Sequence, residues 1–261
     1  MLTTHFIPGT PVWIDLAVPN VEGAAVFYGT LLGWDFSSAG PDAGGYGMFT
    51  LGGKTVAAAG PLTEPGAAPG WTLYFHTADA DATAAAVERA GGAVRVPPMD
   101  VFTAGRMAAF TDPAGAAFAV WQPGETKGLD EVTVAGTLCW TELHTPDPAA
   151  ARSFYEAVFG WEVEDVPMGE FSYALIRPAG GGADSGQGGI VPASADAGQP
   201  VTAPGWRVYF EVADCDAVTA DAVELGGTVH AAAEDVPGVG RVASLADQFG
   251  GRFSVITSVT A

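Results

Sequence analysis

Basic residues are scarce in this sequence of 261 residues, with 10 lysines and arginines against 30 aspartates and glutamates. The formal net charge at pH 7 is therefore −20. A surface with so much negative charge repels phosphate backbones and anionic lipid headgroups. We expect an acidic, solvated surface and no nucleic acid or membrane partner.

Cysteines and long apolar runs are also rare. The two cysteines, Cys139 and Cys215, lie within or at the start of predicted elements, so a disulfide framework is not indicated. No stretch approaches the roughly 18 consecutive apolar residues that a membrane helix needs. The N-terminal residues lack the basic and apolar regions of a signal peptide. We therefore expect a cytoplasmic protein.

A repeat dominates the rest of the sequence. Several residues recur 127 positions later, namely Trp13, Phe27, Tyr28, Gly33 and Trp34 as Trp140, Phe154, Tyr155, Gly160 and Trp161. Others recur 135 positions later, namely Gly70, Trp71, Gly105, Arg106 and Asp112 as Gly205, Trp206, Gly240, Arg241 and Asp247. The eight extra residues lie between Trp161 and Gly205, and we expect much of this gain in the glycine-rich run 179–189. The chain is a tandem duplication.

The repeat divides the chain into a first domain at 8–123, a linker at 124–135 and a second domain at 136–258. In each half an alternating segment is followed by a helical pattern and more strands, and the same order then starts again. The first helix is expected to begin after Asn20 and to end at Gly33. The sequence thus predicts an α+β fold of four strand–helix–three-strand (βαβββ) modules.

Short motifs give this pattern a family resemblance. They are Phe27-Tyr28 with Leu31-Leu32-Gly33-Trp34, Asp112-Pro113-Ala114-Gly115, and their second copies Phe154-Tyr155 with Val158-Phe159-Gly160-Trp161 and Asp247-Gln248-Phe249-Gly250. In this order, twice, they resemble the glyoxalase/bleomycin resistance/dioxygenase (vicinal oxygen chelate) superfamily, and its tandem actinobacterial "hydroxylase" or glyoxalase-like members most. The resemblance implies two tandem domains with curved mixed sheets that form clefts. It also implies that four modules in one chain imitate the dimer of shorter members.

The resemblance further implies where metal-using relatives carry their ligands. Those positions hold Trp13 and Trp140, then Thr72 and Arg207, then Ala119 and Ser254. Indole, alanine and guanidinium offer no free lone pair, and neutral hydroxyls alone do not hold a catalytic divalent ion. We therefore expect neither a metal site nor another cofactor.

Two alternatives for chemistry remain open. His76, His144 and Glu142 have the ligand types for a displaced divalent metal such as Fe, Zn, Ni or Mn. Asp15 and Glu142 occupy equivalent positions beside tryptophans, where a partly desolvated carboxylate could act as a general base. Pairing of either carboxylate with Arg207 or Arg252 would be the structural explanation.

Aromatic residues give the more informative pattern. Strand alternation turns one set of side chains away from the helices, and we expect them to bind a ligand: Trp13, Thr72, Tyr74, Trp121, Trp140, Arg207, Tyr209 and Ser254. Flat rings of this kind suit stacking on an aromatic guest, and arginine adds cation–π or anion contacts. The structural alternative is that the tryptophans fill a disused cleft as core.

These observations predict a metal-independent protein, monomeric or weakly dimeric, that binds an aromatic or apolar small molecule for sequestration, resistance or metabolite tailoring. The alternative is an enzyme of the glyoxalase, lyase, dioxygenase or hydroxylase type with a non-standard metal or carboxylate site. Arg106 and Arg241 follow glycines in both copies, so we expect a structural role, such as holding the turns at Asp112 and Asp247.

Overall fold

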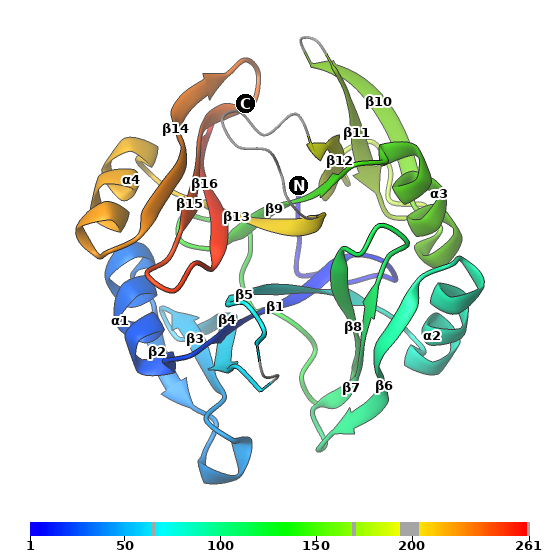
Figure 1. Cartoon of the computed structure of the whole chain (residues 1–261), viewed down its shortest axis with the longest axis horizontal. Coiled ribbons are helices and arrows are strands. Elements are labelled where there is room, and N and C mark those ends of the chain that lie inside the picture. Colours follow the sequence, from blue (N-terminus) through cyan, green and yellow to red (C-terminus); the bar gives the residue numbers. More distant parts are fainter. Residues whose placement is uncertain (64–65, 169–170, 194–203, 260–261) are drawn as a thin grey trace. The chain divides into compact units, whose positions relative to one another are not determined.

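The computed structural model describes residues 1–63, 66–168, 171–193 and 204–259. The first module contains β1 (Pro11–Val18), α1 (Val21–Leu32), β2 (Asp35–Ser38), a 3-10 turn η1 (Pro41–Ala43), β3 (Gly47–Leu51) and β4 (Lys54–Pro61). The second contains β5 (Gly70–His76), α2 (Ala80–Arg89), β6 (Ala93–Val101), β7 (Gly105–Thr111) and β8 (Ala117–Pro123). Figure 1 shows these elements in chain order.

The second half repeats this order. The third module contains β9 (Leu138–Thr145), α3 (Pro148–Phe159), β10 (Glu162–Met168), β11 (Phe171–Arg177) and β12 (Gly188–Pro192). The fourth contains β13 (Gly205–Glu211), α4 (Cys215–Glu224), β14 (Thr228–Val236), β15 (Gly240–Ala246) and β16 (Arg252–Ser258). The predicted α+β fold of four βαβββ modules is confirmed. Within the described residues, no helix is both long enough and apolar enough to cross a membrane.

Each half contributes one mixed sheet of eight strands. The strand order is β2-β3-β4-β1 in the first module and β5-β8-β7-β6 in the second, and the third and fourth modules follow the same plan. In every module the strand before the helix runs parallel to the last strand, and the remaining neighbours are antiparallel. Within β1 the apolar side chains of Val12, Ile14 and Leu16 are fully buried whereas Asp15 is partly exposed, as the alternation predicts.

Capping residues fix the helix ends where the sequence places them. The side chain of Asn20 accepts from the Gly23 N–H at the start of α1, and Gly33 ends the helix with φ of 75°. The start of α3 combines the capping side chain of Asp147 with a proline at the first helical position.

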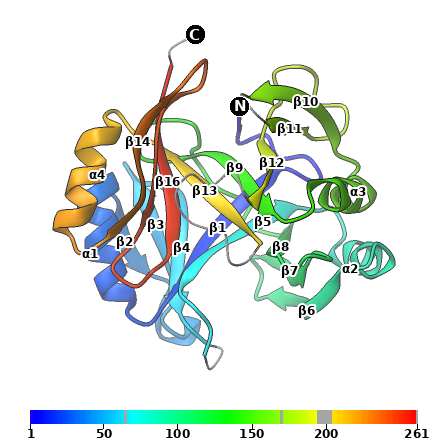
Figure 2. The same ribbon diagram turned by 45° about the horizontal axis from the view of Figure 1, so that its top comes forward.

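Packing groups the modules across the two halves. One compact unit, here the Tyr28 unit, comprises 14–72, 129–139 and 207–261, and the other, the Tyr155 unit, comprises 1–13, 73–128 and 140–206. Helices α1 and α4 lie side by side in the Tyr28 unit, and α2 and α3 do so in the Tyr155 unit (Figures 1 and 2). Each unit therefore takes its helices from opposite halves, while 8–123 and 136–258 describe the repeat in the sequence.

A buried tyrosine, Tyr28, lies at the centre of the core of the Tyr28 unit. The Tyr28 ring is stacked on Trp34, with centroids 5.6 Å apart, and meets Trp71 and Phe253 edge-on at 5.3 and 5.6 Å. Its hydroxyl donates to Asp247 (3.0 Å) and accepts from Trp71 Nε1 (3.2 Å). Burial, and then the nearby charge of Asp247, raise the pKa of Tyr28. The neutral phenol therefore joins a helix of the first half to a turn of the second.

The Tyr155 unit repeats this arrangement with the halves exchanged. Tyr155 on α3 is stacked on Trp161 at 4.9 Å, donates to Asp112 (3.4 Å) and accepts from Trp206 Nε1 (2.9 Å). Burial raises the pKa of Tyr155 as well. The hydrogen bond between a helix tyrosine and an aspartate of the opposite half thus occurs in both units.

Two tryptophans follow the same pattern. Trp34 Nε1 donates to the carbonyl oxygen of Gly136 (2.7 Å), and Trp161 Nε1 donates to that of Gly9 (2.9 Å). Both tryptophans are nearly fully buried, so each indole N–H needs such a partner. Gly9 and Gly136 stand 127 positions apart, so each accepts from the tryptophan of the other half.

Candidate functional site

Four polar and aromatic side chains of the Tyr155 unit form one hydrogen-bonded chain. Trp140 Nε1 donates to the Tyr173 hydroxyl (2.7 Å), which donates to Glu142 Oε1 (2.9 Å). The other carboxylate oxygen, Oε2, lies 3.1 Å from His144 Nε2. Trp140, Glu142 and His144 share one face of β9, as the alternation predicts. The structure therefore brings together three of the predicted residues.

This chain is largely shielded from solvent. The side chains of Glu142 and His144 are 14% and 6% exposed. Nδ1 of His144 is buried and has no hydrogen-bond partner within the described residues. A buried acceptor without a donor costs roughly 1–3 kcal/mol, so an unpaired nitrogen here marks a position where a donor would bind favourably.

A glycine makes room for the tyrosine. Gly189 on β12 pairs with Glu142 in the parallel ladder between β12 and β9. A Cβ atom at Gly189 would lie 2.1 Å from Cζ of Tyr173, so the ring lies directly over this glycine. The local backbone thus holds the Tyr173 hydroxyl beside Glu142.

Alanine at Gly189 is expected to displace the Tyr173 ring and break its hydrogen bonds to Trp140 and Glu142. We expect the free energy of unfolding to fall by roughly 1–3 kcal/mol, because the strand must also shift to relieve the overlap. Urea denaturation measures this change. Gly205→Ala is the control, since a Cβ there meets no atom within 4 Å; equal losses in both variants would contradict the close approach.

The first half carries a reduced version of this chain. The Tyr46 hydroxyl donates to Asp15 Oδ2 (3.1 Å) in the Tyr28 unit. Tyr46 and Tyr173 stand 127 positions apart, as do Asp15 and Glu142, but the position of His144 is Ala17. The two halves thus share a tyrosine and a carboxylate, and only the second half has an imidazole. Sequence reasoning missed both tyrosines, although their spacing was an available signal.

The remaining predicted ligand-binding residues are mostly buried. Tyr74 pairs with Ala119 between β5 and β8, and Tyr209 pairs with Ser254 between β13 and β16. The other members Trp13, Trp121 and Arg207 are buried, and Thr72 is partly exposed. Trp121 Nε1 donates to the carbonyl oxygen of Thr126 (3.0 Å), which fixes this indole against the start of the linker.

The residues at the relatives' metal positions do not fit a divalent ion. Trp140 uses its only N–H on Tyr173, and indole, guanidinium and methyl groups provide no donor pair for a metal. Among the described residues, no group of three His, Cys, Asp or Glu side chains could hold a metal ion. Of the displaced set, Glu142 and His144 lie together, but His76 does not complete a triad with them.

Neither cysteine has the setting of a nucleophile. Cys139 and Cys215 are free and buried. The Cys139 thiol donates to the carbonyl oxygen of Tyr209 (3.3 Å), and burial is the main cause that raises the pKa of both thiols. A raised pKa favours the protonated thiol at neutral pH.

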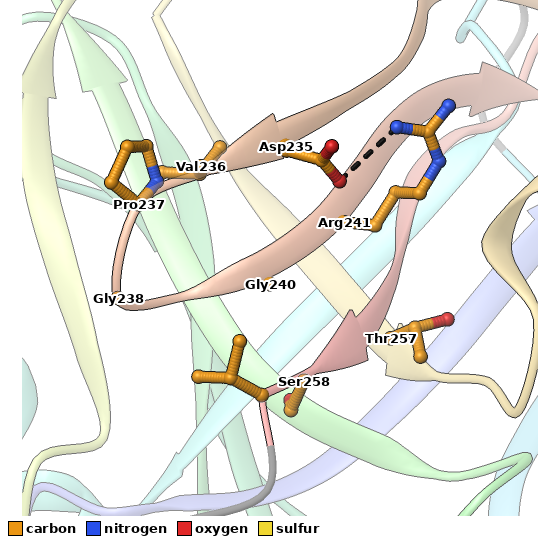
Figure 3. A pocket seen from close by; sticks show the side chains of 9 residues that line it. Asp235, Val236, Pro237, Gly238, Gly240, Arg241, Thr257 and Ser258 are labelled. Carbon is orange, nitrogen blue, oxygen red and sulfur yellow. Dashed lines mark hydrogen bonds and ion pairs between the residues drawn. The ribbon is translucent and has the colours of Figure 1, made fainter.

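Two cavities lie away from the predicted residues. One of about 420 Å³ lies at the β14–β15 hairpin and is lined by Asp235, Val236, Pro237, Gly238, Gly240, Arg241, Thr257, Ser258 and Val259 (Figure 3). Arg241 is already paired with Asp216 and Asp235, so it offers no free cation there. The other, of about 280 Å³, lies beside the N-terminal segment and includes Gln187 in its lining.

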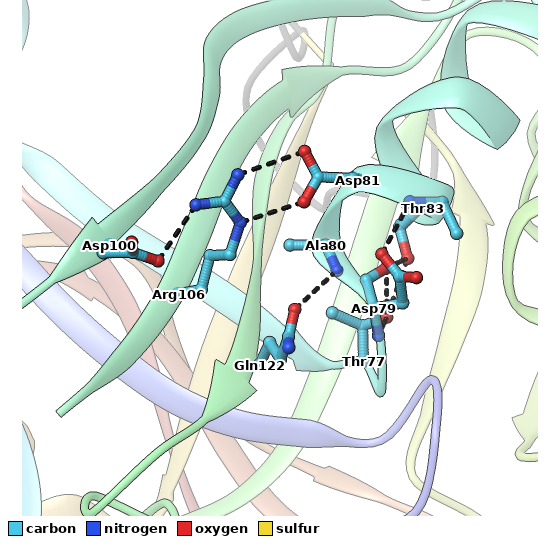
Figure 4. Close-up of polar contacts among 9 residues, drawn as sticks. Thr77, Asp79, Ala80, Asp81, Thr83, Asp100, Arg106 and Gln122 are labelled. Carbon is cyan, nitrogen blue, oxygen red and sulfur yellow. Dashed lines mark hydrogen bonds and ion pairs between the residues drawn. The ribbon is translucent and has the colours of Figure 1, made fainter. Parts of the chain in front are cut away.

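Arg106 and Arg241 are structural, but the predicted partners were wrong. Arg106 contacts both oxygens of Asp81 at the start of α2 (3.0 and 3.1 Å) and Asp100 on β6 (2.9 Å) (Figure 4). Arg241 makes the equivalent contacts with Asp216 and Asp235. Each arginine thus ties a helix N-terminus to a hairpin. The turns at Asp112 and Asp247 are held instead by backbone N–H groups.

The stability of the protein is expected to decrease as the pH falls below 6.5, partly because of His76. Burial lowers the pKa of His76 from 6.5, so between its folded pKa and 6.5 the unfolded chain binds more protons. The free energy of unfolding must then fall as the pH is lowered through this window. His76→Asn should flatten this part of the profile, measured as urea midpoints at pH 7, 6 and 5. Identical slopes in the native protein and the variant would refute the assignment.

The comparisons with known proteins agree with this geometry. Residues 10–120 match the Glyoxalase/Bleomycin resistance protein/Dioxygenase superfamily, and residues 140–256 match the Glyoxalase-like domain. The chain is 41% identical over 272 residues to "Anthracycline biosynthesis protein DnrV" of Streptomyces peucetius, covering 97% of this chain and 94% of the relative. It is 39% identical over 259 residues to "Putative glyoxylase CFP32" of Mycobacterium bovis, covering 97% and 96%.

A solved structure supports the same fold. The Mn(II)-bound glyoxalase from Novosphingobium aromaticivorans superposes with a TM-score of 0.65 at 19% identity, over 97% of this chain and 83% of that one. At such identity the likeness concerns the fold alone. With matched domains in both halves and relatives that align over nearly the whole length, the chain belongs to the glyoxalase/bleomycin resistance/dioxygenase superfamily as two tandem copies of its domain.

Proposed function

We propose that this protein binds a planar aromatic small molecule without a metal ion, in sequestration, resistance or metabolite tailoring. The observation that carries this proposal is the chain from Trp140 through Tyr173 to Glu142 and His144, which begins where metal-using relatives have a ligand. The hydrogen bond to Tyr173 fixes the Trp140 ring, and a fixed indole face favours stacking because little side-chain entropy is lost on binding.

The relative from Streptomyces peucetius supports a fused-ring ligand. Its name assigns it to anthracycline biosynthesis, and it aligns with almost the whole chain at 41% identity. Anthracyclines are fused-ring aromatic compounds, so a ligand of this class suits a wall built from tryptophan and tyrosine. A cytoplasmic location and a monomeric or weakly dimeric state are part of the same proposal.

Titration with 9,10-anthraquinone, read by tryptophan emission, tests this proposal. We expect saturable quenching that is unchanged after dialysis against a chelator, and substoichiometric metal by elemental analysis. Trp140→Phe and Trp13→Phe are a matched pair at equivalent positions. Trp140→Phe lies in the half that carries the proposed site and should weaken the affinity for 9,10-anthraquinone by roughly tenfold, with Trp13→Phe as the control. Stoichiometric metal whose removal abolishes binding would overturn the proposal.

A second candidate is proton-transfer catalysis. The contact of 3.1 Å between Glu142 Oε2 and His144 Nε2 supports it, because a carboxylate that orients an imidazole is a common arrangement for a general base. This candidate predicts that Glu142→Gln abolishes turnover of a bound substrate while its affinity stays within about threefold. Unchanged turnover in Glu142→Gln would eliminate it.

A further inference from the structure

We propose that the site in the second half recognises a hydroxyl group on its aromatic ligand, and that Nδ1 of His144 accepts the hydrogen bond from that hydroxyl. The ligand class is therefore a hydroxylated aromatic, such as a phenol or a hydroxylated fused-ring compound. This inference rests on the proposed function. It adds that the second half recognises the hydroxyl group of the ligand.

The contact with Glu142 determines which ring nitrogen of His144 carries a hydrogen. Glu142 accepts from the Tyr173 hydroxyl through Oε1 and contacts His144 Nε2 through Oε2. With Glu142 ionised, the carboxylate has no proton to give, and the hydrogen of this contact lies on Nε2. In the neutral ring Nδ1 is then an acceptor, and Glu142 fixes this tautomer.

The other ring nitrogen of His144, Nδ1, has no hydrogen-bond partner among the described residues. His144 is only 5% exposed. Any group that pairs with this nitrogen must donate a hydrogen. A neutral hydroxyl meets this requirement and avoids the desolvation cost of burying a second charge.

The spacing of Trp140 and His144 on β9 indicates the length of the ligand. Trp140, Glu142 and His144 share one face of β9. His144 stands four positions after Trp140 on the extended strand, roughly 13 Å at the usual rise per residue. A ring system of three or four fused rings that stacks on Trp140 is long enough to bring a terminal hydroxyl toward His144.

The two halves differ at the position of the imidazole. In the first half the equivalent positions are Trp13, Asp15, Tyr46 and Ala17. The methyl group of Ala17 accepts no hydrogen bond, although Tyr46 and Asp15 keep their contact. The imidazole acceptor therefore belongs to the second half.

Calorimetric titration at pH 7 with 2-hydroxyanthracene and 2-methoxyanthracene tests this inference, because the two probes share a ring system of three fused rings and only 2-hydroxyanthracene donates a hydrogen bond. We expect the native protein to prefer 2-hydroxyanthracene by roughly tenfold. His144→Ala, which gives the second half the residue of the first, should bind both probes equally. His76→Ala is the matched control, because Nδ1 of His76 is also unpaired within the described residues; it should keep the preference.

The outcomes separate the two proposals. If both probes bind the native protein equally, the hydroxyl inference is wrong while aromatic binding stands. If neither this pair nor 9,10-anthraquinone binds, the proposed function fails and this inference with it. Loss of the preference in His76→Ala alone would move the acceptor to His76 and overturn the assignment. The ¹⁵N shift of His144 Nδ1 in the native protein gives a readout without substitution, and it should move with 2-hydroxyanthracene only.

Discussion

Divided within the linker into residues 1–128 and 129–261, the chain is expected to lose its fold in both fragments as monomers. Each compact unit takes its segments from both halves, so neither fragment contains a complete unit. The fragment 1–128 has Tyr28 without Asp247, and Asp112 without Tyr155. Both of its helices lose the helix against which they pack, and the exposed aromatic faces forfeit most of their hydrophobic stabilisation.

Near-ultraviolet circular dichroism and urea denaturation of each fragment measure this loss. Mixing the fragments should restore the native spectrum and a cooperative transition, because the missing partners are then supplied in trans. A fragment that is monomeric by light scattering and unfolds cooperatively would contradict the exchange of modules between halves. A fragment that folds only as a homodimer would obey it, since a second copy then supplies the absent module.

Much of the fold could be predicted because its signals are local. Asn20 and Gly33 mark the ends of α1, and alternation along β1 predicts that Ile14 faces the helix and Asp15 the opposite side; Ile14 is fully buried and Asp15 is partly exposed. These signals depend on a few neighbouring residues and on backbone geometry. The repeat presents these local signals twice, so the four modules could be predicted from the sequence alone.

The exchange between the halves could not be predicted because the duplication hides it. Asp112 and Asp247 occupy equivalent positions, and so do Tyr28 and Tyr155. Pairing within a half and pairing across the halves therefore have the same sequence signature. Only long-range packing decides that Tyr28 donates to Asp247. The partners of Arg106 and Arg241 were misjudged for the same reason, since the contact with a helix N-terminus depends on tertiary structure.

The candidate site was found only in part. Alternation on β9 places Trp140, Glu142 and His144 on one face, but it says nothing of Tyr173, which comes from β11. The repeat contained the missing signal, since Tyr46 and Tyr173 keep the spacing of 127. The partners of Asp15 and Glu142, Ala58 and Gly189, stand 131 apart, so the glycine-rich run takes about half of the insertion. The remainder falls between Pro192 and Gly205, mostly outside the described residues.

Alanine at Asp247 is expected to lower the free energy of unfolding by about 3–5 kcal/mol. Its carboxylate is almost fully buried and accepts from the backbone N–H groups of Phe249 (2.8 Å) and Gly251 (2.9 Å) and from the Tyr28 hydroxyl (3.0 Å). Removal leaves these donors unpaired in an apolar core. The loss exceeds that of an ordinary hydrogen bond because the donors remain buried without a partner.

Asp216→Ala is the matched control in the same unit. Asp216 also accepts two hydrogen bonds, from Arg241, but it is exposed, so water replaces its contacts and the change in stability should be much smaller. Asp247→Asn should fall between the two, because an amide keeps one acceptor oxygen for the turn. Equal losses for Asp247→Ala and Asp216→Ala in urea denaturation would mean that the buried carboxylate does not join the two halves, and the Tyr28–Asp247 pairing would lose its energetic basis.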